Sequence, residues 1–139
     1  MTQLIQVIHG KKGSGKTKRI IDMANNAVKD QNGVVVFIDD DNRYMFDVQQ
    51  PVRFVNAGEY GMSSPEMFYG FLCGMVSQNF DIAYVVIDAF LKLVNVKPDE
   101  TEWFFKKLEQ LAERSNITFV LSVSADDSES PDYIQKYFI

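Results

Sequence analysis

A glycine-rich stretch near the start of the chain has the residue types and spacing of a phosphate-binding loop. Residues 10–17 read GKKGSGKT and match the pattern G-x-x-x-x-G-K-[S/T], between an apolar run and a segment of helical periodicity. Glycines let successive backbone N–H groups turn inward, and the start of the following helix adds partial positive charge, so the loop can hold phosphate oxygens. The predicted binding residues are Gly10, Gly13, Ser14, Gly15, Lys16 and Thr17.

Two side chains of this loop, and one later in the chain, have distinct predicted roles. The ammonium group of Lys16 would neutralise the β- and γ-phosphates of a nucleoside triphosphate. The hydroxyl of Thr17 would ligate Mg²⁺, which takes oxygen ligands and binds together with the phosphates. A further acidic ligand is usual, and Asp88 ends the apolar run YVVID. Thr17 and Asp88 are therefore the predicted metal residues, a role compatible with Asp88 also capping the segment that follows.

A sheet must bring these residues together, and the apolar pattern predicts one. The runs VVVFID and IAYVVID lack polar alternation, as expected of strands buried on both faces of a parallel sheet. Strands are expected at residues 3–9, 34–39, 52–56, 82–88 and 117–124, and helices after the glycine loop, from 65 to 79, from 98 to about 116 and, briefly, from 131. The prediction is one α/β domain over residues 1–139, a three-layer α/β/α sandwich with a mostly parallel central sheet, which binds ligands at its strands' carboxyl ends.

The composition limits the classes of protein. The 139 residues are 46% hydrophobic and 24% charged with a net charge of −5, which suits one globular domain and argues against a broad nucleic-acid-binding surface. Cys73 is the single cysteine, so we expect no disulfide framework and a reducing, cytoplasmic setting. The sequence shows no basic leader, and no apolar run approaches the roughly 20 residues that a membrane span needs. We therefore expect the protein to be neither secreted nor inserted into a membrane.

Three segments together resemble a known superfamily. GKKGSGKT, YVVIDAF and LEQLAERSNITFVLSVSAD are similar to segments of P-loop NTPases, and within that superfamily to domains of RecA and KaiC type. The resemblance implies the P-loop NTPase fold, with ATP and Mg²⁺ as ligands. The sequence has no guanine-selecting Asn-Lys-x-Asp motif, which favours ATP. RecA-like domains often assemble with the nucleotide at an interface, so the resemblance also implies a homo-oligomer or a protein partner.

The same resemblance indicates candidate catalytic carboxylates. VVVFIDDDNRY is similar to the second strand of RecA-type domains, which ends close to the carboxylate that activates the attacking water. Asp39, Asp40 and Asp41 are therefore candidate catalytic residues, together with Lys16.

The resemblance also bears on the rate of hydrolysis. Ser122 and Ser124 end the last strand, where RecA-type domains place a polar sensor of the γ-phosphate. Many related ATPases carry a glutamate directly after the Walker B aspartate, whereas here Ala89 follows Asp88. An alanine cannot orient water, so we expect hydrolysis to be slow.

Three functions follow from these residues. The first is a slow Mg²⁺-dependent ATPase or a nucleotide-dependent switch. The second is a small-molecule phosphotransferase, because DDD after the second strand also resembles the paired aspartates of shikimate-type kinases, with residues 40–64 as lid and pocket. The third is a binding-only module in which the nucleotide holds a conformation that a partner reads. Arg43, Arg53 and Arg114 are candidate arginine fingers or lid residues.

Overall fold

The computed structural model describes residues 3–30 and 32–139. Its centre is a five-stranded sheet in the order β1-β5-β4-β2-β3, and all of its neighbouring strands are parallel. The strands are β1 (Ile5–Gly10), β2 (Val34–Asp39), β3 (Arg53–Asn56), β4 (Ile82–Ile87) and β5 (Thr118–Ser124). The prediction of an α/β fold around a parallel sheet is confirmed.

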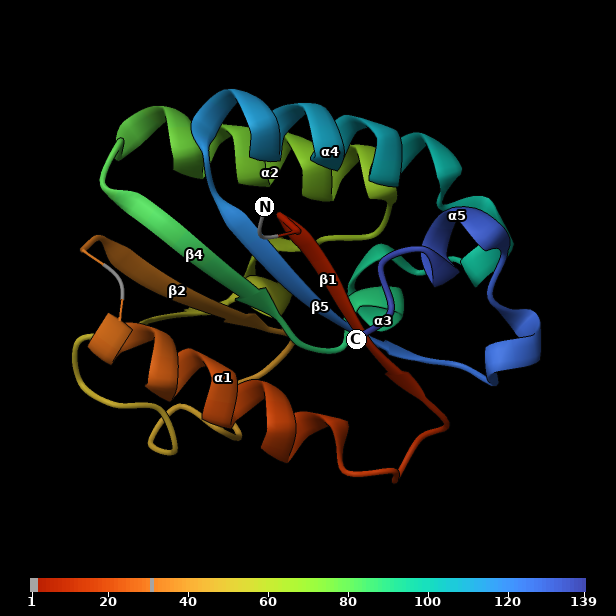
Figure 1. Cartoon of the computed structure of the whole chain (residues 1–139), viewed down its shortest axis with the longest axis horizontal. Coiled ribbons are helices and arrows are strands. Elements are labelled where there is room, and N and C mark those ends of the chain that lie inside the picture. The colour runs from red at the N-terminus through yellow and green to blue at the C-terminus, as the bar shows by residue number, and fades with distance from the viewer. Residues whose placement is uncertain (1–2, 31) are drawn as a thin grey trace.

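Helices cover both faces of the sheet. Figure 1 shows α1 on one face and α2 beside α4 on the other, which gives three layers. The helices are α1 (Lys16–Asp30), α2 (Pro65–Gln78), α3 (Phe90–Val94), α4 (Glu102–Ser115) and α5 (Asp132–Gln135), with short 3-10 helices at Ala57–Tyr60, Pro98–Glu100 and Asp127–Glu129. Within the described residues, no helix has both the length and the apolar character to cross a membrane.

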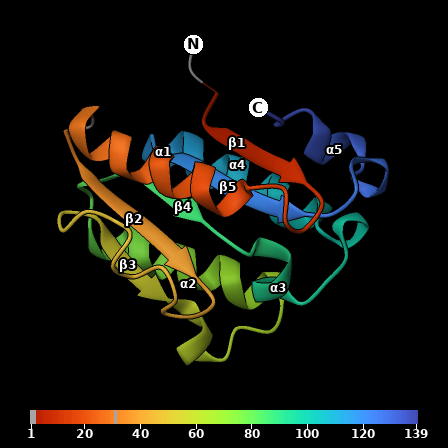
Figure 2. The ribbon, with the colours of Figure 1, turned by 90° about the horizontal axis from the view of Figure 1, so that it is seen from below.

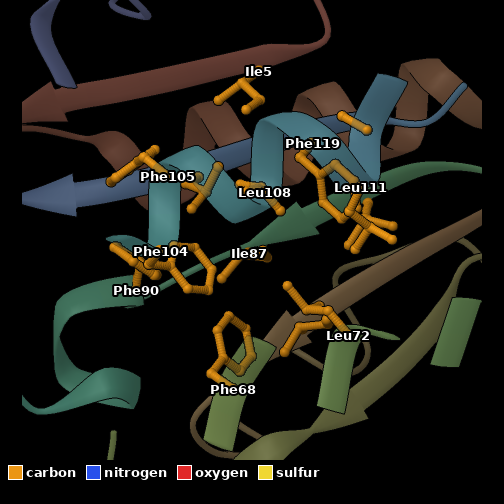
Figure 3. Close-up of a cluster of buried hydrophobic side chains, with 14 of the residues drawn as sticks. Ile5, Phe68, Leu72, Ile87, Phe90, Phe104, Phe105, Leu108, Leu111 and Phe119 are labelled. Atoms are coloured by element: carbon orange, nitrogen blue, oxygen red, sulfur yellow. The ribbon is translucent and has the colours of Figure 1, made fainter. Parts of the chain in front are cut away.

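Each face of the sheet has its own hydrophobic core, which explains the unbroken apolar runs. In β2, Val36 and Ile38 belong to the core beneath α2 and α4, whereas Val35 and Phe37 belong to the core beneath α1. Because successive strand residues point to opposite faces, a strand covered on both sides needs apolar residues at every position. Figure 3 shows the larger core, in which aromatic side chains such as Phe68 and Phe104 fill the space between sheet and helices.

The structure differs from the sequence prediction around residues 90–102. Helix α3 was not expected, because five residues are too few to display helical periodicity. Helix α4 begins at Glu102 and not at Pro98. The chain first makes a separate 3-10 turn, in which the Glu100 side chain accepts a hydrogen bond from the Lys97 backbone at 3.1 Å, and the Thr101 hydroxyl donates to the Pro98 carbonyl at 2.7 Å. These local bonds close the turn before the helix starts.

Candidate functional site

The loop between β1 and α1 has a backbone that depends on glycine. Gly10, Gly13 and Gly15 have φ angles of 133°, 86° and 84°, a region that side-chain-bearing residues rarely adopt. A Cβ atom added to Gly10 would also lie 2.8 Å from the Ser14 hydroxyl oxygen. The conformation of the loop is therefore specified by its glycines, and it leads directly into the first turn of α1 at Lys16.

Lys16 is 7% exposed and turned back onto its own loop. Its Nζ donates to the Lys11 carbonyl at 2.7 Å and to the Ser14 hydroxyl at 3.2 Å. Burial lowers the pKa of Lys16, and the nearby charge of Asp88 offsets part of that effect. The hydrogen-bond acceptors of this buried ammonium are thus neutral oxygens, and an anion in the loop would interact with it more strongly.

Asp88 lies at the centre of a hydrogen-bonded network that joins three segments. Its Oδ2 accepts a hydrogen bond from the Thr17 hydroxyl at 3.2 Å, and its Oδ1 accepts one from the Ser122 hydroxyl at 2.5 Å. The Ser122 oxygen in turn accepts the backbone N–H of Ala89 at 3.0 Å. The predicted metal residues Thr17 and Asp88 are therefore adjacent. The Ser122 hydroxyl, on β5, holds the Asp88 carboxylate in the orientation in which it meets Thr17.

Asp39, at the end of β2, is placed beside Asp88 by the register of the sheet. Ile38 pairs with Ile87 across β2 and β4, and the Asp88 backbone N–H donates to the Ile38 carbonyl at 2.9 Å. Asp39 is 2% exposed, and its Oδ2 has no hydrogen-bond partner among the described residues. Burial and the neighbouring carboxyl groups of Asp40 and Asp88 raise the pKa of Asp39 to about 8, although the hydrogen bond from the Asp40 backbone N–H acts in the opposite direction.

The two following aspartates are paired with cations at the edge of the site. Asp40 Oδ2 lies 2.7 Å from Lys92 Nζ, and Asp41 Oδ2 lies 3.2 Å from the Arg43 guanidinium. Burial is the largest single effect and would raise the pKa of Asp40, but the hydrogen bond and charge of Lys92, together with the neighbouring Asp39, lower it by more in sum, so the net shift is downward. Lys92 belongs to α3, so the helix that the sequence did not predict supplies a cation to this site.

These groups line one cleft of about 560 Å³ at the carboxyl ends of the strands. Figure 2 shows the loop after β1 and helix α3 at this edge of the sheet. Of the six predicted loop residues, Gly13, Gly15, Lys16 and Thr17 line the cleft, whereas Gly10 and Ser14 act on the conformation of the loop and on Lys16. The other lining residues are Lys12, Lys18, Asp39, Asp40, Asp41, Arg43, Tyr44, Asp88, Ala89, Leu91, Lys92 and Ser124.

The remaining candidates separate into residues at the cleft and residues away from it. Arg43 and Ser124 line the cleft, whereas Arg114 lines a different cavity, at the opposite end of β4 beside Ile82. Arg53 begins β3 and pairs in register with Val36, well before the end of β2. Ser122 is buried, and its hydroxyl is already bonded to Asp88 and Ala89.

Two residues of the site had a weaker signal or none in the sequence. The role of Ser122 as a support for Asp88 could have been suspected, because a hydroxyl within the apolar run ITFVLSVS must find a buried partner. Lys92 had no such signal, since its place beside Asp40 depends on the unpredicted helix α3.

The cleft thus combines groups suited to an anion with groups suited to a cation. Lys16 and the N-terminal end of α1 can interact with phosphate oxygens, while Thr17 and Asp88 offer the oxygen ligands that Mg²⁺ takes. No model of a known protein family matches the chain, and no curated protein matches it.

Proposed function

We propose that this protein is a P-loop nucleotide-binding protein of RecA or KaiC type, which binds Mg²⁺-ATP in the cleft and hydrolyses it slowly or uses it as a switch. One observation carries the proposal. Thr17, in the glycine loop, and Asp88, 71 residues later at the end of β4, meet at 3.2 Å beside the buried Lys16. A phosphate-binding loop with a paired hydroxyl and carboxylate is what a triphosphate and its Mg²⁺ require.

The hydrogen bonds of Lys16 support the phosphate-binding role. Its ammonium is bonded to Lys11 O and Ser14 Oγ, both within the loop, and phosphate oxygens could replace these neutral acceptors without disturbing the core. Hydrogen bonds to charged groups contribute more than neutral ones, about 1.5–3 kcal/mol each. Lys16 would therefore contribute a large part of the binding free energy of the triphosphate.

The network around Asp88 supports the metal-binding role. Ser122 occupies one carboxylate oxygen, which leaves the other directed at the Thr17 hydroxyl. Supporting hydrogen bonds of this kind orient metal-binding carboxylates and hold them ready for the ion. When bound, Mg²⁺ would offset the negative charge of the phosphates at Thr17 and Asp88.

Calorimetry tests nucleotide binding. We expect Lys16→Ala to weaken Mg²⁺-ATP binding at least about tenfold, because it removes a charge-assisted contact of about 1.5–3 kcal/mol. Lys29→Ala, at the exposed last turn of the same helix, is the matched control and should bind as the unaltered protein does. Equal ATP affinity in the Lys16 and Lys29 variants would contradict the proposal.

The metal assignment has its own test. Asp88→Asn should reduce ATP affinity in Mg²⁺ much more than in EDTA, since only the first depends on the ion. A loss of the same size in both conditions would assign Asp88 a purely structural role.

Slow hydrolysis follows from the surroundings of Asp88. The next residue, Ala89, has no acceptor for a water proton, and Asp39, the carboxylate that ends the neighbouring strand β2, is buried. We expect turnover on the order of minutes per event, far below the roughly 1–100 per second of kinases. Phosphate release above about one per second in a verified monomer, unaffected by Asn at residues 39–41 together, would contradict this mechanism.

A phosphotransferase is the second candidate, and the extent of the cleft favours it. The cavity continues from the glycine loop to Arg43, Tyr44 and Lys92, which leaves room and polar groups for an acceptor molecule. The same turnover assay, repeated with small hydroxyl-bearing compounds, distinguishes the two. A transferase would release ADP rapidly only with its acceptor present, whereas a hydrolase would be unaffected.

A further inference from the structure

Three consecutive carboxylates, beginning at the last residue of β2, converge in the cleft. One carboxylate oxygen from each of Asp39, Asp40 and Asp41 lies within 4.8 Å of the other two. Consecutive residues in a regular strand would point in opposite directions, so the turn at the end of β2 is what brings these oxygens together. All three residues line the cleft.

The second observation is the unpartnered oxygen of Asp39. Oδ1 of this residue accepts the backbone N–H of Asp40 at 2.7 Å, but Oδ2 is buried and has no partner among the described residues. Of all the buried side-chain nitrogens and oxygens in the described part of the chain, this atom alone lacks a hydrogen bond. A buried oxygen without a donor is costly. The metal-free carboxyl avoids that cost only by holding a proton, and a positively charged ligand from outside the chain would remove the cost as well.

The cations that now face the cluster are loosely held. Lys92, paired with Asp40, has a side chain 72% exposed, and Arg43, paired with Asp41, has a side chain 65% exposed. The Arg43–Asp41 pair is exposed on both sides, and such pairs contribute little, about 0–1 kcal/mol, whereas the Asp40 side chain is 16% exposed and its pair with Lys92 is the stronger of the two. Both can swing into solvent without disturbing the core, which would leave the three carboxylates open to a metal ion.

We propose that Asp39, Asp40 and Asp41 bind a divalent cation of the Mg²⁺ or Mn²⁺ type, at a site separate from Thr17 and Asp88. Three carboxylate oxygens and several retained waters suit Mg²⁺, whereas Ca²⁺ takes six to eight oxygen ligands and would need more protein groups than the cluster offers. The all-oxygen donor set likewise disfavours zinc and copper, which take nitrogen and sulfur ligands.

This cation would have a specific role in the cleft. Three of the lining carboxylates, Asp40, Asp41 and Asp88, would face a bound triphosphate with like charge, and a second cation would reduce that repulsion. It would also hold water molecules in the cleft beside Asp39. The role rests on the proposed nucleotide function, but binding of the cation does not, and the experiment is designed without nucleotide.

Titration with Mn²⁺ in the absence of nucleotide tests the site, with the free ion followed by electron paramagnetic resonance. We expect one bound Mn²⁺ per chain, and binding weaker by about tenfold or more in Asp39→Asn, the range seen when metal ligation is impaired. Asparagine matches aspartate in size and carries no charge, so the fold should be retained. Asp41→Asn, at a partly exposed position, should weaken binding in the same direction.

Two control variants distinguish this cluster from surface carboxylates and from the Thr17 position. Asp81→Asn removes an exposed carboxylate at the opposite end of β4 and should bind Mn²⁺ as the unaltered chain does. Thr17→Ala should also leave nucleotide-free Mn²⁺ binding unchanged, because Thr17 belongs to the other metal position.

The proposal is overturned if Asp39→Asn binds Mn²⁺ like the unaltered chain, if Thr17→Ala abolishes the binding, or if no saturation occurs below about 10 mM, weaker than ordinary protein divalent sites. In that case the proton that Asp39 holds in the metal-free chain is enough to satisfy the buried oxygen, and no cation is bound. Failure of the nucleotide proposal is read separately, from ATP calorimetry of Lys16→Ala, so either proposal can fail alone.

Discussion

The aromatic core and the cleft lie on one sheet and follow opposite rules. Beneath α2 and α4 the buried side chains are apolar, and the centre of that core is a group of contacting phenylalanines at positions 68, 90, 104 and 105. Within residues 3–30 and 32–139, six polar or charged residues are buried, and four of them, Lys16, Asp39, Asp88 and Ser122, gather at the carboxyl ends of the strands or in the loop beside them.

The comparison indicates that the aromatic core stabilises the fold, whereas the buried polar groups of the cleft lower its stability. Burial of aromatic surface is favourable with few geometric demands, whereas each buried polar group must find a partner. Ser122 and Asp88 satisfy each other, but Asp39 keeps an oxygen without a donor among the described residues. We therefore expect substitutions in the aromatic core to destabilise, and some substitutions in the cleft to stabilise.

The largest effect is expected in the core. Phe104→Ala should lower the free energy of unfolding by about 3–5 kcal/mol, because it leaves a cavity among the other phenylalanines. Urea denaturation measures the loss. Phe80→Ala is the matched control, since Phe80 is 92% exposed and its removal should change stability by no more than about 0.5 kcal/mol. Equal losses in both variants would contradict the position assigned to this core.

The second effect has the opposite sign and depends on pH. The folded-state pKa of Asp39 is raised to about 8, so between about pH 4 and pH 8 the folded chain holds a proton that the unfolded chain releases. Stability from this group is present at low pH and lost as the pH rises through that interval. Asp39→Asn should remove this dependence and raise the free energy of unfolding at pH 8 by a few kcal/mol, at about 1.4 kcal/mol per unit of pKa difference.

Chemical denaturation at pH 5 and pH 8 in EDTA provides the measurement. The difference between Asp39→Asn and the unaltered chain should grow with pH. A constant difference, or one that shrinks toward pH 8, would mean that Asp39 is ionised in the folded protein without a bound cation.

Ser122→Ala is expected to have an intermediate effect. It removes the donor to Asp88 and the acceptor of the Ala89 N–H, which should destabilise the fold by about 1–3 kcal/mol. It should also weaken Mg²⁺-ATP binding more than ATP binding in EDTA, because the carboxylate at Thr17 loses its support. Ser77→Ala, at an exposed position of α2 away from the cleft, is the control. Should Ser122→Ala lower both affinities equally, Ser122 supports the fold and not the metal position.

The smallest effect concerns the backbone beside Asp88. Ala89 has a φ angle of 56°, in the left-handed region that costs alanine roughly 1–2 kcal/mol. Ala89→Gly should therefore stabilise the fold by about 0.5 kcal/mol once the greater freedom of glycine in the unfolded chain is subtracted. Asn95→Gly is the control, because asparagine tolerates the same φ of 56° better. If thermal unfolding shows no greater stabilisation for Ala89→Gly than for this control, the left-handed backbone at Ala89 does not destabilise the fold.

The sequence predicted the strands well because their signal is local and strong. The run VVVFID corresponds to β2 residue for residue, since a strand covered on both faces must be apolar throughout. The region from α3 to α4 was predicted poorly, because the hydrogen bonds of Lys97, Glu100 and Thr101 compete locally with the helix.

The candidate site likewise has parts that the local sequence predicts and parts that it does not. The conformation of the glycine loop is a property of adjacent residues, and Gly10, Gly13 and Gly15 determine it wherever they stand between a strand and a helix. The partnership of Thr17 with Asp88 was predicted from the phosphate-loop pattern and from the apolar run that ends at Asp88, whereas the role of Ser122 as the support of Asp88 was not predicted.

What the sequence determines by itself is therefore what adjacent residues can specify: the strand and helix periods, the glycine backbone and the residue types at the end of each strand. The tertiary structure decided which of those strand ends meet. Ile38 pairs with Ile87, and Ile87 with Leu121, so the sheet register brings Asp39, Asp88 and Ser122 to one edge. The unpartnered oxygen of Asp39 is a product of that packing, because only the folded chain excludes water from it.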